Sequence, residues 1–541
     1  MRPRSSFKPT NGRQSKPLSA DRFIPALAAL LSINALFLLP LWWRDGLFTA
    51  WLIPELWLLP VLIGVIPGRW WTWCLASLLG FLFLALSGDA LVRDVLDRPL
   101  NLILDPLLLR AGFHFLSGSL GFGSAALIAI AATVLVGLIV WVLRRLIQTT
   151  DPLQSGTVGW MLSVASIGII LIGLEFNAAP ALRPALVQLT ISQTEEIQST
   201  LEAGARLIER ADSPRLKARA IPALADRDVI VVFVESYGIS AWMQTQYRRV
   251  IEPLSANAKD ALRAAGLEVM TTRLRSPIRG GQSWLAHASL LSGQRIDNDL
   301  AYRRILSSNQ DFLSDDLAAS GHHTIVVAPA IVRPWPEARE LGFDHQYSAT
   351  ALDYLGPGAG WVGIPDQFTL HRFSQLRADH PAPSFSLLLL ISSHAPWLPG
   401  PPLLDDWSRL NLGLPWPDWT PPPRDRLIYL RDSDRLRARY PESLAYSLEA
   451  VLAWAVRDLP PDALLLVMGD HQPAALITGK DTSQDVPVHL ISADAERLSK
   501  PAGNFEFLPG FRPPSDPAVV GLEDLREWFR SRPDSLKTQS P

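Results

Sequence analysis

Five apolar segments in the first third of the chain limit its fold more than any other feature. They lie at about 23–43, 47–66, 70–87, 124–142 and 158–174. A segment that spans a bilayer forms a helix, because the hydrocarbon core offers the backbone no water to bond. Such a helix needs about 20 apolar residues to cross that core. Trp42, Trp70, Trp141 and Trp160 lie near segment ends, as aromatic residues at membrane interfaces do. We therefore expect a membrane domain of about five helices over residues 23–176.

The basic residues around these segments predict their orientation. Residues 1–22 carry several Arg and Lys without an apolar period, and Arg144 and Arg145 follow the fourth segment. Because Lys and Arg are enriched in cytoplasmic loops, the first segment should begin inside, after a basic cytoplasmic tail. Five crossings then place the chain beyond residue 176 outside. The expected localisation is the inner (plasma) membrane, multi-pass, with the following domain periplasmic or extracellular. Glu55 is an awkward charge in the second segment, and it either faces the bundle or shifts that helix.

The remainder of the chain predicts three further regions. Residues 177–227 have amphipathic helical spacing, which indicates a juxtamembrane stalk. Residues 228–510 alternate between strand and helix patterns, which predicts an α/β domain with a mostly parallel sheet covered by helices. Residues 511–541 are expected to be a C-terminal tail with one short helix at 522–529. The expected strands are 229–234, 267–271, 324–328, 384–391, 463–468 and 486–491, and the expected helices include 255–265, 312–320 and 441–457.

The net charge argues against a nucleic-acid partner, and the cysteine content excludes an intrachain disulfide. The formal net charge is −2, and no basic stripe is interleaved with aromatic residues, so we expect no nucleic-acid partner. The one cysteine, Cys74, lies in an apolar segment. An intrachain disulfide is therefore impossible, and the fold must depend on its core. No sequence feature indicates an oligomeric state.

Two of the expected strands end in side chains that bind metals. The strand at 229–234 is followed by Glu235, and the strand at 463–468 is followed, after one glycine, by Asp470 and His471. Ligands bind at the carboxyl ends of strands in open α/β sheets. A carboxylate beside an imidazole also offers two kinds of ligand to one divalent ion. These residues predict a metal site, although charged residues are common at strand ends without one.

The segment 279–293 contains a candidate nucleophile. Gly280 and Gly281 predict a tight turn, and Ser283 lies where a helix should begin. Backbone N–H groups and the dipole at a helix N-terminus favour phosphate or sulfate. An alternative is that Ser283 is an N-cap with a purely structural role.

Together these motifs resemble the alkaline phosphatase and sulfatase superfamily. The closer resemblance is to its membrane-anchored branch of lipoteichoic acid synthases and periplasmic glucan phosphoglycerol transferases. That branch has five N-terminal membrane helices and an extracytoplasmic sulfatase-like domain, so the resemblance implies a sulfatase-like α/β domain here. The family pattern is a strand ending in Glu-Ser, a Gly-rich turn with a Thr or Ser nucleophile, and a late Gly-Asp-His. The matching residues here are Glu235-Ser236, Ser283 and Gly469-Asp470-His471. His394, within Ser392-Ser393-His394-Ala395-Pro396, matches a family histidine that follows a strand.

The resemblance is less complete around the substrate. Lipoteichoic acid synthases carry His-Gly, Phe-Trp and Arg in the glycerol phosphate pocket, and only Trp335 matches cleanly. Arg333 or Arg339 would substitute for the phosphate contact, and His394 completes the expected substrate-binding set. Ser283 lacks the downstream Pro and Arg that direct conversion to formylglycine in sulfatases. An unmodified serine fits phosphoryl transfer better than sulfate hydrolysis.

The resemblance implies a metal-dependent phosphotransferase. It would move a phospholipid head group, with phosphoglycerol favoured, onto an extracytoplasmic glycan or polymer through a phosphoryl-serine at Ser283. One divalent ion would be held by Glu235, Ser283, Asp470 and His471, with Mg²⁺ or Mn²⁺ favoured and Zn²⁺ an alternative. His394 would protonate the leaving alkoxide or stabilise phosphoryl charge, unless it is a structural histidine.

Two other classes of function stay open. A phosphodiesterase or an unusual sulfatase would use the same residues, with water as the acceptor. A non-catalytic membrane protein would keep a degenerate domain, although such a domain would be expected to lose part of this motif set.

Overall fold

The computed structural model describes most of the chain between residues 20 and 532. The described residues are 20–65, 68–96, 98–106, 109, 112–113, 116–117, 121–153, 157–175, 184–211, 213–358, 363–411, 415–421, 432–479, 482–495, 499 and 505–532. Most of the expected basic tail therefore lies outside them. The chain divides into two units, Met1–Arg93 with Pro99–Gln198 and Asp94–Arg98 with Ser199–Pro541. The main division falls within helix α7 (Ala185–Ala211), inside the expected stalk.

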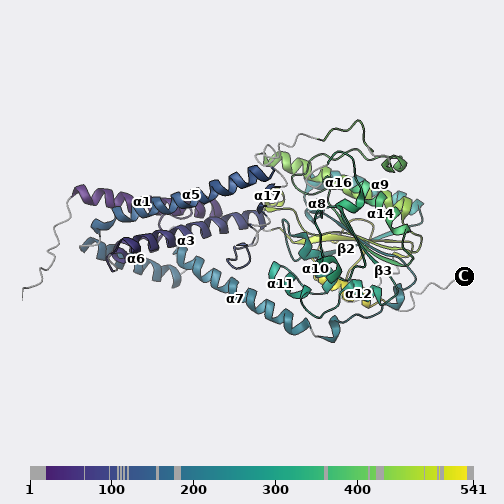
Figure 1. Ribbon diagram of the computed structural model, residues 1–541, viewed down its shortest axis with the longest axis horizontal. Helices are drawn as coiled ribbons and strands as arrows, with labels where there is room; N and C mark the ends of the chain where they lie inside the picture. The colour runs from purple at the N-terminus through teal and green to yellow at the C-terminus, as the bar shows by residue number, and fades with distance from the viewer. Residues whose placement is uncertain are drawn as a thin grey trace, which may run out of the picture. The chain divides into compact units, whose positions relative to one another are not determined.

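The first unit contains three helices that are long and apolar enough to cross a membrane (Figure 1). They are α1 (Ala20–Asp45), α3 (Arg69–Leu96) and α5 (Phe122–Thr149), which match the first, third and fourth expected segments. The fifth segment forms the shorter apolar helix α6 (Thr157–Glu175). A short 3-10 turn, η2 (Asp151–Leu153), lies between α5 and α6.

The second expected segment differs from a membrane-spanning helix. It forms a 3-10 turn, η1 (Pro54–Leu58), followed by α2 (Leu59–Val65). These elements are together about 20 Å long, less than the roughly 30 Å of a bilayer core. The carboxylate of Glu55 has a structural use, since its Oε1 accepts hydrogen bonds from the backbone N–H groups of Leu186 (2.8 Å) and Val187 (2.9 Å). These amides belong to the first turn of α7, where a carboxylate satisfies donors that have no partner within the helix. Five crossings are therefore not confirmed.

The second unit is built on an eight-stranded sheet of order β4-β3-β5-β1-β6-β7-β2-β8. The strands are β1 (Val229–Val234), β2 (Glu268–Arg275), β3 (His323–Ala328), β4 (His345–Ser348), β5 (Ser384–Leu390), β6 (Leu464–Gly469), β7 (Asp485–Ser492) and β8 (Leu508–Pro509). The five strands from β4 to β6 in this order are parallel to their neighbours. The pairs β6–β7, β7–β2 and β2–β8 are antiparallel. The expected mostly parallel sheet is thus confirmed, with an antiparallel flank.

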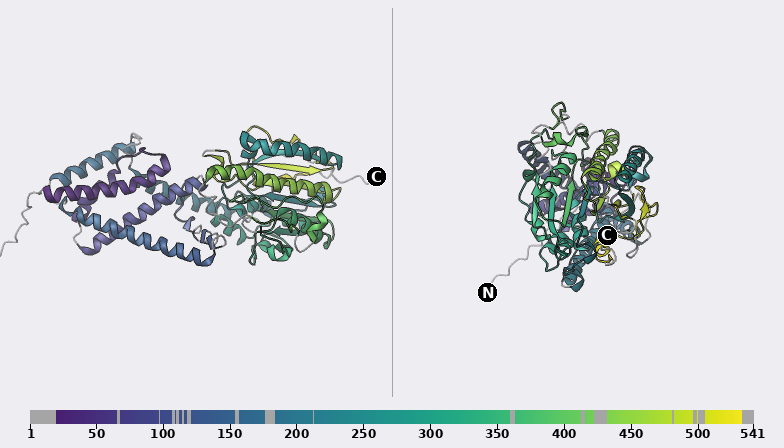
Figure 2. Two further views of the ribbon diagram at one scale, coloured as in Figure 1. Left: turned by 90° about the horizontal axis from the view of Figure 1, so that it is seen from above. Right: turned by 90° about the vertical axis from the view of Figure 1, so that its right-hand side faces the viewer.

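Both faces of the sheet are covered by helices (Figures 1 and 2). Residues of β1 alternate between two cores: Val231 and Phe233 lie in one, and Val232 and Val234 lie in the other. The helices that contribute to the first core are α10 (Ser283–Ser292), α11 (Asp299–Leu306), α12 (Leu313–Ala318) and α19 (Leu525–Arg530). Those that contribute to the second are α9 (Thr245–Ala264), α14 (Asp366–Ala378) and α16 (Ser433–Asp458). A strand buried on both faces is the pattern that its continuous apolar run predicts.

Short elements complete the second unit. The short α-helices are α8 (Ser240–Met243), α13 (Glu337–Glu340) and α17 (Ala475–Thr478). The 3-10 turns are η4 (Pro214–Leu216), η5 (Pro222–Leu224), η6 (Ala349–Leu352), η7 (Trp407–Asn411) and η8 (Leu522–Asp524).

The segment after residue 510 packs into the domain, in contrast to the expected tail. Phe511 lies in one core, and Leu522, Leu525, Trp528 and Phe529 lie in the other. The helix expected at 522–529 is present as η8 followed by α19. The folded unit therefore continues through the last described residues, and the boundary expected at residue 510 falls inside it.

We expect Trp528→Ala to destabilise the second unit substantially. The Trp528 side chain is 1 % exposed, and truncating a buried tryptophan costs about 3–5 kcal/mol through lost burial and the cavity left behind. Thermal unfolding of the full chain in detergent, followed by limited proteolysis, measures the effect. The matched control is Val519→Ala, because Val519 is 80 % exposed and should change stability by less than about 0.5 kcal/mol. Equal melting temperatures for the two variants would contradict a folded C-terminal segment.

Candidate active site

The register of two parallel strands brings the first site residues together. Val234, the last residue of β1, is paired with Gly469, the last residue of β6. Glu235 and Asp470 therefore leave neighbouring strands at the same edge of the sheet. Gly469 has no space for a side chain, since a Cβ atom there would lie 1.8 Å from the carbonyl oxygen of Tyr237. The glycine therefore allows the segments after β1 and β6 to approach closely.

The turn before α10 places Ser283 at the start of that helix. Gly280, Gly281 and Gln282 all have positive φ angles, of 75°, 141° and 67°. Glycine adopts such angles at little cost, whereas Gln282 is held in the left-handed region. The turn is tied to the segment after β6, because the Gly280 N–H donates to the carbonyl oxygen of Gln472 (2.9 Å). Ser283 is thereby brought to the edge that carries Glu235 and Asp470.

The four residues that the sequence singled out as ligands form one cluster. The Ser283 hydroxyl donates to Glu235 Oε2 (3.0 Å) and lies 3.2 Å from His471 Nε2. His471 Nε2 lies 3.4 Å from Glu235 Oε1 and 3.7 Å from Asp470 Oδ2. One ligand atom from each of Glu235, Asp470 and His471 lies within 4.8 Å of the others. All three side chains are buried, so the cluster is an interior site with the hydroxyl of Ser283 at its edge.

Backbone groups orient these side chains. His471 Nδ1 lies 2.8 Å from the carbonyl oxygen of Gln472, which can only accept, so Nδ1 carries the hydrogen. Nε2, the nitrogen that faces the cluster, is then the one available to a metal. Asp470 Oδ1 accepts from the backbone N–H groups of Ser236 (2.8 Å) and His471 (2.7 Å). Such partners fix the orientation of metal ligands in known sites.

The charges of the cluster favour a cation at its centre. Burial and the nearby charge of Glu235 raise the pKa of Asp470 to about 7. Burial lowers the pKa of His471, but the two carboxylates outweigh it and raise that pKa to about 9. Burial also opposes ionisation of Glu235, yet its hydrogen bond and charge interaction with His471 hold its pKa below the usual value. Without a bound ion, a proton on His471 would supply the positive charge that two buried carboxylates require.

The donor set fits a divalent metal ion. Two carboxylates, one imidazole nitrogen and one hydroxyl are ligands that Mg²⁺, Mn²⁺ and Zn²⁺ accept, with the oxygen donors favouring the first two. Metal binding would replace the proton of His471, because a ligating imidazole is neutral. Glu235, Asp470 and His471 would therefore hold the ion, with Ser283 beside it.

His394 lies at the same edge of the sheet, in the turn after β5. It is half-buried, and its Nδ1 lies 2.6 Å from the Ala395 carbonyl oxygen. Its charge contributes to lowering the pKa of Glu235, which indicates proximity to the cluster. The turn itself is fixed by buried Asp366, whose Oδ1 accepts from the N–H groups of Ile391 and Ser392, each at 3.0 Å. No motif or pattern in the sequence singles out Asp366.

The three other expected substrate residues lie apart from these contacts. Trp335 is half-buried and packs against the first core, whereas Arg333 and Arg339 are exposed. Within the described part of the chain, these side chains make no hydrogen bond, ion pair or ring contact with Glu235, Ser283 or the residues after β6. Their role in substrate binding stays a prediction.

His287 is a residue near the site that the sequence analysis missed. It lies four residues after Ser283 in α10, and its ring centroid is 4.5 Å from that of Phe233 in β1. Burial lowers its pKa to about 3, so the imidazole is neutral near pH 7. Interactions with the charges of Glu235 and His471 also contribute to its pKa, which places it beside the cluster. His287 could have been found from the sequence, because a residue four positions after Ser283 lies on the same helix face.

Comparison with protein-family models finds no match, and comparison with curated protein sequences finds none either. Solved structures give weak similarities, of which three are the lipooligosaccharide phosphoethanolamine transferase A of Neisseria meningitidis, the phosphoglycerol transferase GacH of Streptococcus pyogenes, and an alkaline phosphatase superfamily protein of Vibrio parahaemolyticus. The first is 15 % identical, with a TM-score of 0.47 over 88 % of this chain and 89 % of that one. The second is 15 % identical (TM-score 0.32; 55 % and 74 % covered), and so is the third (TM-score 0.37; 63 % and 79 % covered).

The three structures are thus a phosphoethanolamine transferase, a phosphoglycerol transferase and an alkaline phosphatase superfamily protein, and the sequence motifs did not single out the first class. At such identities and TM-scores, the similarity assigns no activity, head group or acceptor to this chain. The function therefore has to be inferred from the geometry of the site.

We expect Asp470→Asn to weaken metal binding by at least about 100-fold, because a neutral amide replaces a buried anionic ligand. Metal content of the purified full chain, measured by mass spectrometry after dialysis against limiting Mn²⁺, gives the result. Asp260→Asn is the matched control, since Asp260 is exposed on α9. Unchanged occupancy in the Asp470 variant would rule out this residue as a ligand.

Proposed function

We propose that this chain is a metal-dependent phosphotransferase that moves a phospholipid head group, with phosphoglycerol favoured, onto an extracytoplasmic glycan or polymer. The observation that carries the proposal is the position of Ser283. Its hydroxyl lies within 3.2 Å of both a carboxylate and an imidazole, at the first residue of α10. A hydroxyl with such neighbours at a helix N-terminus is placed to attack an anionic phosphoryl group.

The proposed reaction has two displacement steps. Ser283 Oγ forms a bond to phosphorus while the bond from phosphorus to the diacylglycerol oxygen breaks. His394 gives a proton to the departing alkoxide, the proton of the Ser283 hydroxyl passes to solvent, and the product is a phosphoryl-serine. An acceptor hydroxyl then attacks the same phosphorus and gives its proton to His394, and Ser283 leaves and regains a proton from solvent. A bound divalent ion supplies Lewis acidity, which lowers the pKa of the Ser283 hydroxyl and stabilises charge on the phosphoryl oxygens.

The first unit supports a lipid donor. Its three long apolar helices are suited to a bilayer, where phospholipid head groups are abundant. Three crossings and five crossings are both odd numbers, so either places the second unit on the side opposite the N-terminus. The basic N-terminal residues favour a cytoplasmic start. We therefore propose a plasma-membrane protein whose second unit is periplasmic or extracellular.

We expect Ser283→Ala to lower turnover by about 1000-fold or more, because it removes the attacking oxygen. Ser283→Thr should retain measurable turnover, since the hydroxyl stays on the same carbon. The assay measures diacylglycerol released from labelled phosphatidylglycerol by the full chain with Mn²⁺, and mass spectrometry detects the phosphoryl-serine. Ser289→Ala, which alters a buried hydroxyl further along the same helix, is the matched control.

Full turnover by the Ser283→Ala protein would exclude Ser283 as the nucleophile, and Ser236 would be the next residue to test. Release of free glycerol phosphate at the same rate without any acceptor would favour the phosphodiester hydrolase. An aldehyde at Ser283 in active protein would replace the transferase proposal with a sulfatase.

Reporter fusions test the proposed topology. A fusion after Arg227 should report the outer side, because an odd number of crossings precedes it. A fusion after Thr150 should report the cytoplasm, since Arg144 and Arg145 near the end of α5 favour that side. An outer signal at Thr150 would reduce the crossings to three, and a cytoplasmic signal at Arg227 would refute the proposed localisation.

A further inference from the structure

The second unit contains a large pocket at the end of α10 that is distant from Ser283 along the helix. Its volume is about 1390 Å³, and it is lined by segments around residues 213–219, 293–298 and 523–530 together with the end of α7. Ser283 is the first residue of α10, and Gly293 follows its last. Ten residues of α-helix, about 15 Å, therefore separate the candidate nucleophile from the pocket.

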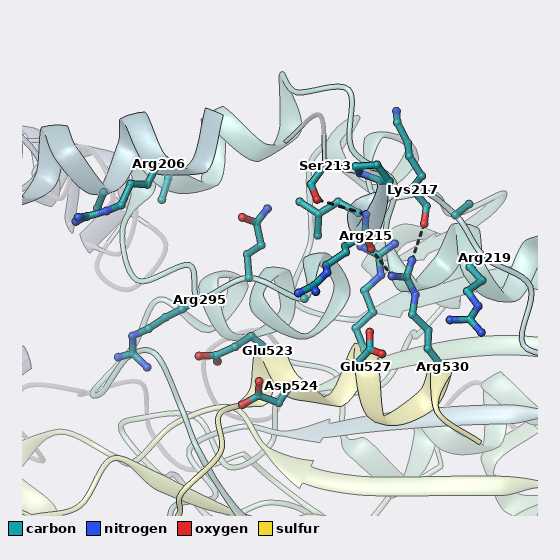
Figure 3. Close-up of a pocket in the computed structure, with 18 of the residues that line it drawn as sticks. Arg206, Ser213, Arg215, Lys217, Arg219, Arg295, Glu523, Asp524, Glu527 and Arg530 are labelled. Carbon is teal, nitrogen blue, oxygen red and sulfur yellow. Dashed lines mark hydrogen bonds between the residues drawn. The ribbon is translucent and has the colours of Figure 1, made fainter. Parts of the chain in front are cut away.

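The pocket wall is rich in charge and predominantly basic. Its basic residues are Arg206, Arg215, Lys217, Arg219, Arg295, Arg526 and Arg530, and its acidic residues are Asp297, Glu523, Asp524 and Glu527. Figure 3 shows the basic side chains of the 213–219 segment opposite the acidic side chains of η8 and α19. Both kinds of group thus face one space, which is unusual for a site that binds a simple anion.

Two of the arginines hold the wall together. Buried Asp316 accepts hydrogen bonds from Arg526 Nε (2.9 Å) and Arg530 Nε (2.8 Å). Arg530 Nη2 also donates to the carbonyl oxygen of Lys217 (2.7 Å), which fixes the 213–219 segment against α19. The pocket therefore has a built frame, and these arginines have structural partners.

The side chains of Arg215 and Arg219 have no such structural partners. Both are exposed, and within the described part of the chain their side chains make no hydrogen bond or ion pair. Guanidinium groups bind phosphate and carboxylate in bidentate fashion. These two side chains are accordingly available for an anionic ligand.

Glu523 offers a complementary group. Its Oε2 atom is buried without a hydrogen-bond partner, and burial raises the pKa of this carboxyl group. Oε2 is enclosed, but the side chain lines the pocket, so its carboxyl group can accept a hydrogen bond from a ligand hydroxyl. A ligand that carries only anionic groups would make no such bond to Glu523.

We propose that this pocket binds an anionic glycan, meaning a sugar chain that bears phosphate or carboxylate groups. The arginines of the 213–219 segment contact its anionic groups, and Glu523 accepts from its sugar hydroxyls. The volume exceeds the roughly 300–1,000 Å³ typical of small-molecule sites, which suits several linked sugar units. The role of this glycan as acceptor or product rests on the proposed transferase function, whereas its binding does not.

Direct binding to the catalytically inactive Ser283→Ala full chain in detergent tests the proposal. The probe is tetragalacturonate, an anionic tetrasaccharide, and the uncharged comparison is maltotetraose. Adding Arg215→Ala and Arg219→Ala should weaken tetragalacturonate binding at least about tenfold, because two charge-assisted contacts are lost. Arg249→Ala, at an exposed arginine on α9 outside the pocket, is the control and should leave affinity within about twofold. Isothermal titration calorimetry measures each affinity.

Two further comparisons separate glycan binding from general attraction of anions. Glu523→Ala should weaken tetragalacturonate binding but leave inorganic tripolyphosphate binding unchanged. Equal affinity of the double arginine variant and its parent, or equal affinity for maltotetraose and tetragalacturonate, would overturn the proposal. Stronger binding to phosphatidylglycerol vesicles than to the glycan, lost in the arginine variant, would assign the pocket to lipid head groups instead. Glycan binding without any transferase activity would retain this pocket and refute only the proposed reaction.

Discussion

The candidate site depends on the parallel pairing of β1 with β6. Parallel neighbours end at the same edge of a sheet, and the pairing of Val234 with Gly469 aligns the two ends. Glu235 and Asp470 are therefore forced into one buried space. A shift in this register would separate them, since each residue along a strand also reverses the face that its side chain occupies. The candidate metal site is thus a consequence of sheet geometry rather than of any one loop.

Bringing two carboxylates together in the interior is costly unless a positive charge accompanies them. The raised pKa values of Asp470, about 7, and His471, about 9, express that need. A folding domain gains nothing from such a cluster that apolar residues would not supply at lower cost. This cost is retained at an edge of the sheet where ligands bind, and a functional role that includes a bound cation would account for it.

The sequence predicted the centre of the domain better than its margins. Uninterrupted apolar runs predict strands β1 and β6, because such runs indicate burial on both faces, and the ends of these strands predict the candidate metal-binding cluster. The edge strand β4 reads His-Gln-Tyr-Ser, which has no apolar pattern, and β8 has two residues. Helix α16 begins at Ser433 and continues through Pro441, whereas the sequence pattern predicts a helix only over 441–457. The use of Glu55 as a partner for amides more than 100 residues away cannot be inferred from local pattern.

The position of Ser283 is determined from both ends of α10. At the N-terminus, the glycine turn is hydrogen-bonded to Gln472, which is adjacent to His471 in the candidate metal site. At the C-terminus, Arg526 Nη1 donates to the Ser292 carbonyl oxygen (3.0 Å), and a cation there also complements the helix dipole. Gly293 allows this approach, because a Cβ atom would lie 3.0 Å from Arg526 Cδ. The segment after residue 510 therefore supports Ser283, the candidate nucleophile, through α10. This contact explains why residues beyond 510 belong to the domain core.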